Sequence, residues 1–184
     1  MSTEFYNRNW RMPKSSNSSK VSNYSMEFDG LFEYIDLGND SILDFYNKEM
    51  SFSLWLNTGS TGLEGVFGDC NSAGTVLQYS IDTNRTANKI TFLSIPGLSS
   101  PYLVSNIDIT TNTWYHVVIT KSGSSANWLY TMYINGSSAN GGTANGTQEA
   151  TSITSISIGK FGALPSSAGV NFDGKIDHVA IFDY

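Results

Sequence analysis

The sequence predicts an all-β chain, a two-sheet antiparallel β-sandwich of the jelly-roll type, with a flexible N-terminal arm. Charged residues make up 14% of the 184 residues, aromatic residues reach 13%, and there are 17 glycines. This composition is typical of β-proteins with long polar loops. Short apolar segments also alternate with turn residues along most of the chain, which indicates successive strands rather than helices.

The expected strands begin at Tyr24 and are separated by turn residues such as Asp29-Gly30 and Pro96-Gly97. About eleven short strands at this spacing favour two packed antiparallel sheets. In order, they are expected at 24–28, 32–37, 50–57, 66–69, 76–81, 90–95, 102–109, 114–121, 129–135, 153–159 and 176–183.

The final strand shows the clearest alternation. Ile176, His178, Ala180 and Phe182 share one face, and the residues between them share the other. The strand is expected to follow a Gly-Lys turn at 174–175.

Two segments between the strands are read differently. Residues 42–47 are expected to form a single helical turn. Residues 135–146, rich in Gly, Ser and Asn, predict one long mobile loop.

The charge is uneven along the chain. Residues 1–23 carry four basic residues and one acidic residue, a net charge of +3, which leaves −9 for the remainder because the total is −6. A solvated tail is one interpretation. Apolar side chains in the arm favour the other, in which it docks on the acidic face of a neighbouring subunit. The candidate assembly residues are Phe5, Tyr6, Arg8, Trp10, Arg11 and Met12.

Composition excludes several partners and compartments. Four positive charges beside an acidic body match nucleic acid poorly, so no nucleic-acid partner is expected. No stretch approaches the roughly 18 apolar residues of a membrane helix, so no membrane insertion is expected. The N-terminal residues have no apolar signal-peptide core, and Cys70 has no second cysteine with which to pair. Synthesis in the cytoplasm without a signal peptide is therefore expected.

Five phrases carry a resemblance to the laminin G-like, or concanavalin A-like, domains over residues 24–184. They are Ser25-Met-Glu-Phe-Asp-Gly30 with Tyr34-Ile-Asp-Leu-Gly38, Met50-Ser-Phe-Ser-Leu-Trp-Leu56, Thr113-Trp-Tyr-His-Val-Val-Ile-Thr120, Tyr133-Ile-Asn-Gly136, and the closing Phe172–Tyr184. The resemblance implies a concanavalin A-like jelly roll. It does not by itself imply one function, since this fold carries lectins, adhesion modules, hydrolases and structural domains.

The catalytic pattern of glycanases with this fold is not matched. Retaining enzymes need two carboxylates about 5–5.5 Å apart on one strand, whereas Glu27, Asp29 and Glu33 span an expected turn. Asp29 is expected to cap that turn and Glu33 to face solvent. His116 is expected to be a core histidine beside Trp114. No enzyme is therefore predicted.

The sequence also offers candidates for a calcium site. Relatives hold Ca²⁺ with loop carboxylates, because this ion takes 6–8 oxygen ligands. The loop after residue 158 reads Gly159-Lys-Phe-Gly-Ala-Leu164 and offers no carboxylate. Asp36 and Asp40 remain candidates for a looser site, with turn capping as the alternative. Otherwise no cofactor is expected.

A glycan site needs an aromatic platform beside polar loop groups. Trp55 lies on the polar side of its strand, and Trp128 begins a strand after a polar loop. With Tyr102 and Tyr130, they are the candidate carbohydrate-binding residues. In the alternative interpretation Trp55 is covered by loops and Trp128 belongs to the core.

An extracellular type of fold in a chain without a signal peptide is explained if the protein is released by lysis. The arm Asn7-Arg-Asn-Trp-Arg-Met-Pro13, which runs into Val21-Ser-Asn-Tyr-Ser-Met-Glu-Phe-Asp-Gly30, resembles the start of virion proteins of marine tailed phages. This resemblance implies a capsid-decoration or adhesion protein. Its location would be a virion or an extracellular surface, and its partners other virion or assembly subunits, itself included, and a cell-surface glycan. Two alternatives stay open: a carbohydrate-binding module of a larger extracellular protein, and a filament subunit that assembles by strand addition.

Overall fold

The computed structural model describes residues 24–40, 43, 48–70, 77–95, 102–124, 127–145, 155–160 and 171–183. These residues form β1 (Met26–Asp29), β2 (Ile35–Gly38), β3 (Met50–Thr58), β4 (Glu64–Cys70), β5 (Leu77–Thr83), β6 (Ile90–Ile95), β7 (Tyr102–Val104), β8 (Tyr115–Ser124), β9 (Asn127–Ile134), β10 (Ser137–Asn145), β11 (Ser155–Ile158) and β12 (Asp173–Asp183). The expected arm at 1–23 lies outside the described residues. So does the expected helical turn, apart from Leu43.

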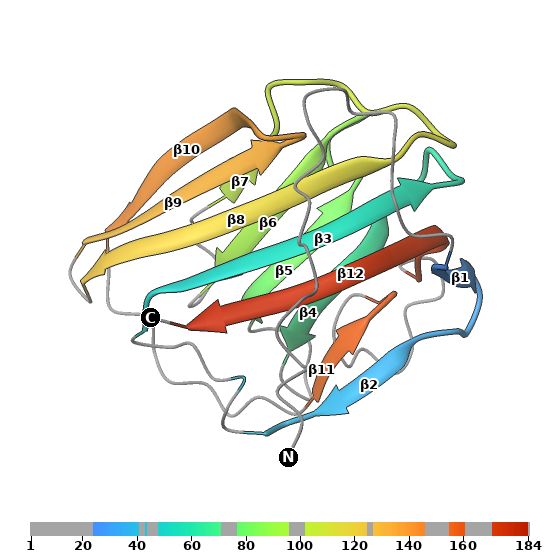
Figure 1. The fold of residues 1–184 in the computed structure, drawn as a ribbon, viewed down its shortest axis with the longest axis horizontal. Coiled ribbons are helices and arrows are strands. Elements are labelled where there is room, and N and C mark those ends of the chain that lie inside the picture. Colours follow the sequence, from blue (N-terminus) through green and yellow to red (C-terminus); the bar gives the residue numbers. More distant parts are fainter. Residues whose placement is uncertain are drawn as a thin grey trace, which may run out of the picture.

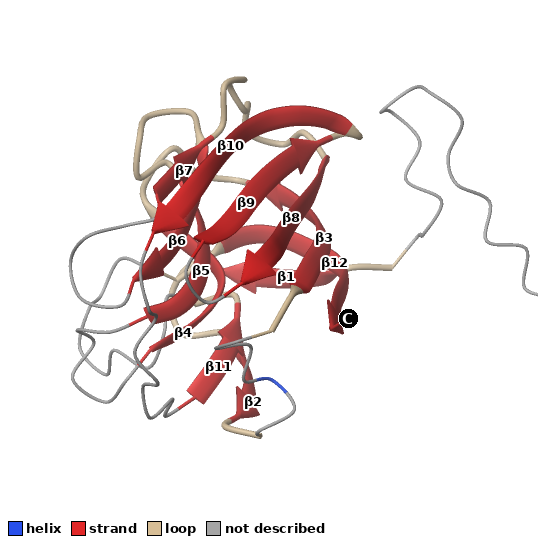
Figure 2. Cartoon of the chain, turned by 90° about the vertical axis from the view of Figure 1, so that its left-hand side faces the viewer, coloured by secondary structure: helices blue, strands red, loops and turns tan. Residues whose placement is uncertain are grey.

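The strands form two six-stranded sheets that face each other as two layers (Figures 1 and 2). Sheet A has the order β1-β12-β3-β8-β9-β10, and sheet B has the order β2-β11-β4-β5-β6-β7. Neighbouring strands in both sheets are antiparallel. The predicted all-β, jelly-roll-like sandwich is therefore confirmed.

The core lies between the two layers, and the alternation of β3 shows how the sequence builds it. Phe52, Leu54 and Leu56 are almost fully buried. The two outward-facing residues that alternate with them between Leu54 and Thr58 are half-buried. Phe52 meets Phe67 of β4 at 5.3 Å and Tyr79 of β5 at 4.7 Å, measured between ring centroids. Three rings in contact therefore join sheet A to sheet B.

The segment expected to be a long mobile loop is instead strand β10. Its residues pair with β9 from Ser137 opposite Ile134 to Asn145 opposite Asn127. A shift of register near Ala139 marks a bulge, and Ala139 itself is buried. Gly, Ser and Asn have low strand propensity, so the ladder with β9 at the sheet edge overrides a weak local signal.

The closing strand also differs from the expectation. Residues 174 and 175 belong to β12 and pair with Thr58 and Asn57, so no Gly-Lys turn precedes the strand. A bulge between Asp177 and Ala180 inserts one extra residue, and His178 adopts a left-handed φ of 49° there. The bulge reverses the alternation, because two residues then oppose one on β3.

The reversal decides which side chains of β12 enter the core. Ile176 is buried, but beyond the bulge Ile181 packs against the core and Phe182 is exposed. The expected common face of Ile176, His178, Ala180 and Phe182 is therefore wrong after residue 177.

Polar side chains on the outer side of sheet B are buried. Ser80, Asp82 and Thr91 are at most 1% exposed, and Asp82 stands opposite Thr91 in the β5–β6 ladder. One carboxylate oxygen of Asp82 accepts a hydrogen bond from Arg85 Nε at 2.7 Å. Burial raises the pKa of Asp82 to about 7, and Arg85 opposes the shift only in part.

We expect Asp82 to make stability depend on pH. Its folded pKa lies above its ordinary value, so its contribution is fully present at acidic pH and is lost as the pH rises through about 7. Asp82→Asn imitates the protonated acid at every pH. Urea unfolding should therefore show the variant gaining stability relative to wild type between pH 5 and pH 8. An equal difference at both pH values would contradict this origin of the pH dependence.

Candidate functional site

One end of the sandwich gathers three described loops from both layers. These are the β3–β4 loop at 59–63, the β5–β6 loop at 84–89 and the β7–β8 segment at 105–114. The last of these was expected to continue a strand to residue 109, but β7 ends at Val104. Turn-forming residues such as Asn106 and Asp108 interrupt the strand, and the released segment becomes a wall of the site.

Glu64 connects the strand ends beneath these loops. The side chain is 3% exposed, and its carboxylate accepts hydrogen bonds from Thr58 Oγ1 at 2.7 Å and Thr83 Oγ1 at 3.2 Å. It also accepts one from the backbone N–H of Asp173 at 3.1 Å. Burial raises the pKa of Glu64, while these three bonds oppose the shift. One carboxylate thus ties β4 to β3, β5 and β12, strands of both sheets.

Asparagines in left-handed conformations shape the loops. Asn84, Asn88 and Asn112 have φ angles of 61°, 60° and 59°, which asparagine tolerates better than most side chains. Asn84 Oδ1 accepts a hydrogen bond from the N–H of Asn88 at 3.2 Å. The carbonyl of Asn88 in turn accepts one from Ile109 at 2.8 Å. The β5–β6 loop is therefore fastened to the β7–β8 segment.

A hollow of about 330 Å³ opens between the three loops, and we call it the end pocket. Its volume falls at the lower end of the range of small-ligand sites, roughly 300–1,000 Å³. Seven of the nine lining residues carry a hydroxyl or amide group, and the other two are one carboxylate and one aliphatic residue. The lining residues are Thr58, Ser60, Thr61, Asn84, Asn88, Asp108, Ile109, Thr110 and Thr111.

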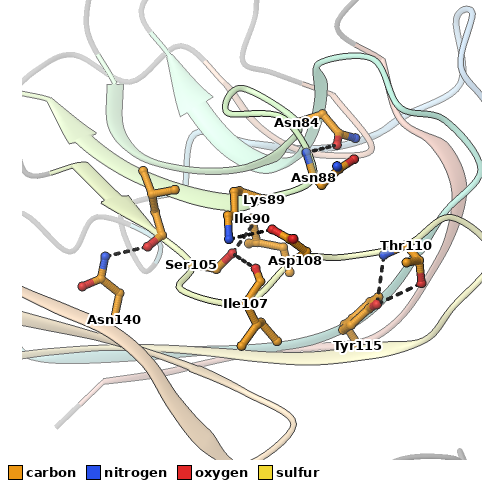
Figure 3. A network of polar contacts seen from close by, with 11 residues as sticks. Asn84, Asn88, Lys89, Ile90, Ser105, Ile107, Asp108, Thr110, Tyr115 and Asn140 are labelled. Atoms are coloured by element: carbon orange, nitrogen blue, oxygen red, sulfur yellow. Dashed lines mark hydrogen bonds and ion pairs between the residues drawn. The ribbon is translucent and has the colours of Figure 1, made fainter.

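The charge in the end pocket is neutralised by an ion pair. Asp108 Oδ1 lies 2.7 Å from Lys89 Nζ, and the Asp108 side chain is 70% exposed (Figure 3). The pocket thus offers polar groups with almost no net charge. Such a surface suits a ligand that carries many hydroxyl groups and no charge of its own.

Further hydrogen bonds hold the wall of the pocket (Figure 3). Ser105 Oγ donates to the carbonyl of Ile107 at 2.9 Å and accepts from the N–H of Ile90 at 3.2 Å. The hydroxyl of Tyr115 accepts from the N–H of Thr110 at 3.0 Å. These bonds fix the segment before a ligand arrives, which lowers the entropy lost on binding.

Of the predicted aromatic residues, Trp55 keeps a ring at the surface. It is half-buried on the outer face of sheet A and stacks on His116 of β8, with 5.0 Å between ring centroids and 23° between planes. His116 Nε2 lies 2.9 Å from Ser53 Oγ, and burial lowers the pKa of the imidazole. His116 is thus a half-buried partner of Trp55 on the outer face, which corrects the expectation of a core histidine beside Trp114.

Trp128 and Tyr130 do not form a surface platform, because both face the core. They are 3% and 0% exposed. The ammonium of Lys121, itself buried, lies 4.1 Å from the centre of the Trp128 ring and covers it through a cation–π contact. The backbone of Tyr102 lies in β7, and its side chain is outside the described residues.

The acidic residues singled out in the sequence are used in turns. Asp29 Oδ1 accepts a hydrogen bond from Leu31 N at 2.8 Å, and Glu33 is exposed, as expected. Asp36 Oδ1 accepts one from Gly38 N at 2.8 Å. Among the described residues no group of three His, Cys, Asp or Glu side chains could hold a metal ion. A calcium site at Asp36 and Asp40 stays a prediction.

One known protein family matches most of this chain. The family described as the concanavalin A-like lectin/glucanases superfamily, a laminin G domain family, matches residues 29–184. The chain belongs to this superfamily. No curated protein matches its sequence at a significant level.

Several solved structures resemble this laminin G domain at low sequence identity. The carbohydrate-binding module CBM40 of the Ruminococcus gnavus IT-sialidase, bound to α2,3-sialyllactose, has a TM-score of 0.64 and 12% identity, over 86% of this chain and 88% of that one. Domain 4 of the Geobacillus stearothermophilus arabinanase AbnA, in complex with arabinotriose, has 0.57 and 20%, over 86% and 70%. A heptameric pentraxin from Limulus polyphemus has 0.54 and 16%, over 73% and 64%. These likenesses show the fold.

The described part of the domain contains no helix long and apolar enough to cross a membrane.

The sequence did not reveal the end pocket, because its residues come from three separate loops. Clusters such as Asn84-Arg-Thr-Ala-Asn88 look like ordinary turns. Repeated asparagines at positions that require a left-handed backbone are the signal that could have pointed to them.

We expect Glu64→Ala to lower the free energy of unfolding by about 3 kcal/mol, because it removes the buried carboxylate that accepts hydrogen bonds from two hydroxyls and one amide. Urea unfolding monitored by tryptophan fluorescence measures this loss. The matched control is Glu49→Ala. That side chain accepts one surface hydrogen bond, from Gly123 N at 2.8 Å, and its loss should cost less than about 1 kcal/mol. Equal losses would show that Glu64 is not a special connection.

Proposed function

We propose that this laminin G domain is a non-enzymatic, lectin-like module that binds a neutral saccharide in the end pocket. The single observation that carries the proposal is the lining of the pocket. Seven of its nine lining residues carry a hydroxyl or amide group, and its one carboxylate is paired with Lys89. A sugar presents a fringe of hydroxyls, each both donor and acceptor, and such groups can satisfy them.

The chemistry of the pocket favours neutral over anionic sugars. An anionic sugar would bring its charge close to Asp108, and Lys89 is already engaged by that carboxylate at 2.7 Å. A like charge close to Asp108 disfavours binding. The side chain of Ile109 adds a small apolar surface for the C–H face of a sugar ring.

Two solved relatives make the substrate class a reasonable one to test. One is bound to sialyllactose and the other to arabinotriose. The anionic and the neutral ligand of these relatives are suitable probes for this chain. We expect arabinotriose and other neutral oligosaccharides to bind better than sialyllactose.

We expect the double variant Asn88→Gly/Thr111→Val to weaken saccharide binding by about tenfold or more, because it removes one amide and one hydroxyl from the pocket. Glycine keeps the left-handed backbone that position 88 requires, and valine has nearly the shape of threonine. A screen of neutral and sialylated glycans, followed by calorimetry with the best ligand, measures the effect.

The matched control for this experiment is Asn112→Gly. Asn112 has the same left-handed conformation, with φ at 59°, but does not line the pocket. Its affinity should equal that of wild type. Binding that survives in the pocket variant but is lost in Trp55→Ala would place the site on the Trp55–His116 stack instead. Absence of binding to every glycan would contradict the proposed function.

Display of the domain on an assembly is the second candidate function. The basic, aromatic arm at 1–23 supports it, and a virion protein is the case that the resemblance at residues 7–13 and 21–30 implies. The virion context and the cell-surface glycan stay predictions. The alternatives of a module in a larger extracellular protein and of a filament subunit also stay open.

A further inference from the structure

The sandwich exposes apolar side chains mainly along one side. The described residues include nine large hydrophobic side chains with substantial exposure, and six of them lie between residues 24 and 37. They are Tyr24, Met26, Leu31, Phe32, Tyr34 and Leu37. We call the segment 24–40, with these side chains, the β1–β2 edge. Apolar residues grouped in this way usually mark an interaction surface, whereas isolated ones need no explanation.

The two strands of the β1–β2 edge are edge strands, one in each sheet. β1 is the first strand of sheet A and pairs with β12, and β2 is the first strand of sheet B and pairs with β11 (Figure 1). No described strand lies on the other side of either. Edges of this kind readily accept a segment of another chain.

The turn within the β1–β2 edge is held in place. Asp29 Oδ1 accepts a hydrogen bond from Leu31 N at 2.8 Å, and Gly30 N donates to the carbonyl of Phe172 at 3.0 Å. The amide of Asn171 donates to the carbonyl of Leu31. Phe32 nevertheless remains 85% exposed. An exposed ring on a fixed turn loses little conformational freedom when a partner covers it.

The charge of the edge points to its occupant. Residues 24–40 contain five acidic residues and no basic residue, while residues 1–23 carry a net charge of +3 with Phe5, Tyr6 and Trp10 among the basic side chains. The edge already holds one cation over an aromatic ring, because Lys160 Nζ lies 4.5 Å from the centre of Tyr34. The basic and aromatic side chains of the arm therefore complement the acidic and aromatic side chains of the β1–β2 edge.

The expected buried area is sufficient for a dimer. Each aromatic side chain can bury about 150–250 Å², so the three of one arm bury roughly 450–750 Å². Two arms, together with the edge surfaces that they cover, exceed the roughly 1,000 Å² of total area that a specific interface needs. A reciprocal exchange of arms between two copies supplies two such contacts.

From these observations we propose that residues 5–12 of one chain dock on the β1–β2 edge of a second copy. The aromatic residues of the arm cover Phe32 and its neighbours, and Arg8 and Arg11 face Glu27, Asp29 and Glu33. This proposal goes beyond saccharide binding and does not depend on it, because association is measured without any glycan.

Light scattering on the full chain tests the proposal. Wild type should give a mass of at least twice the 20.1 kDa of one chain, and association should weaken as salt is raised. Trp10→Ser in the arm and Phe32→Ser on the edge should each weaken it by about tenfold or more. The control Leu129→Ser removes a side chain of 45% exposure on β9, away from the edge, and should leave the mass unchanged.

Mixing the two variants separates arm docking from general stickiness. Trp10→Ser keeps an intact edge, and Phe32→Ser keeps an intact arm, so an equimolar mixture contains one complete contact. Heterodimers should form in the mixture at concentrations where each variant alone is monomeric.

Three outcomes would overturn the proposal. They are a monomeric wild type, an oligomer that neither substitution weakens, and a mixture without heterodimers. A monomeric wild type would also be the result if the arm docked on its own subunit. At a concentration low enough for both proteins to be monomeric, urea unfolding of Phe32→Ser should match wild type, since the replaced ring is exposed and not part of the core.

Discussion

The end of the sandwich depends on one buried carboxylate. Glu64 accepts hydrogen bonds from the ends of β3 and β5 and from the start of β12, and so joins strands that belong to different sheets. A carboxylate loses much of its hydration when it is buried, and the raised pKa of Glu64 reflects that cost. Hydrogen bonds from two hydroxyls and one backbone amide offset part of that cost. Where the strands end, and hence where the loops begin, follows from this connection.

The two proposed surfaces use different parts of the same frame. The end pocket is formed by loops that the sandwich holds at one end, and its polar groups are kept in place by the left-handed asparagines and by Ser105 and Tyr115. The β1–β2 edge is formed by strands whose outer side has no described neighbour. One surface is polar and nearly neutral, and the other is apolar and acidic. A domain of this kind can be anchored through one surface while it presents the other.

Most of the fold could be predicted because it depends on local patterns. The alternation at 50–57 places Phe52, Leu54 and Leu56 in the core as expected, and the family phrases fall on strands and turns. Strand β10 was missed because its Gly, Ser and Asn residues have no strand signal of their own and pair only because β9 is beside them. The bulge at His178 was missed because a single inserted residue leaves no mark on a strand pattern read from one chain.

The candidate site was predicted less well, for a related reason. Whether an aromatic residue lies on the surface depends on the sheet that faces it. Trp55 falls on the outer face as its alternation indicated, whereas Trp128 and Tyr130 alternate equally well but face the core. The end pocket brings together residues from 58 to 111 that have no common motif. Its groups meet only because Glu64 and the antiparallel pairing of β3 with β8 bring the three loops to one end.

The most direct measurement is an NMR titration of the ¹⁵N-labelled full chain with the neutral oligosaccharide that binds best. If the end pocket is the binding site, backbone amide shifts will be concentrated at 58–61, 84–88 and 108–111, with little change near Trp55 and His116. Shifts centred on Trp55 and His116, or no shifts at millimolar saccharide, would contradict the account.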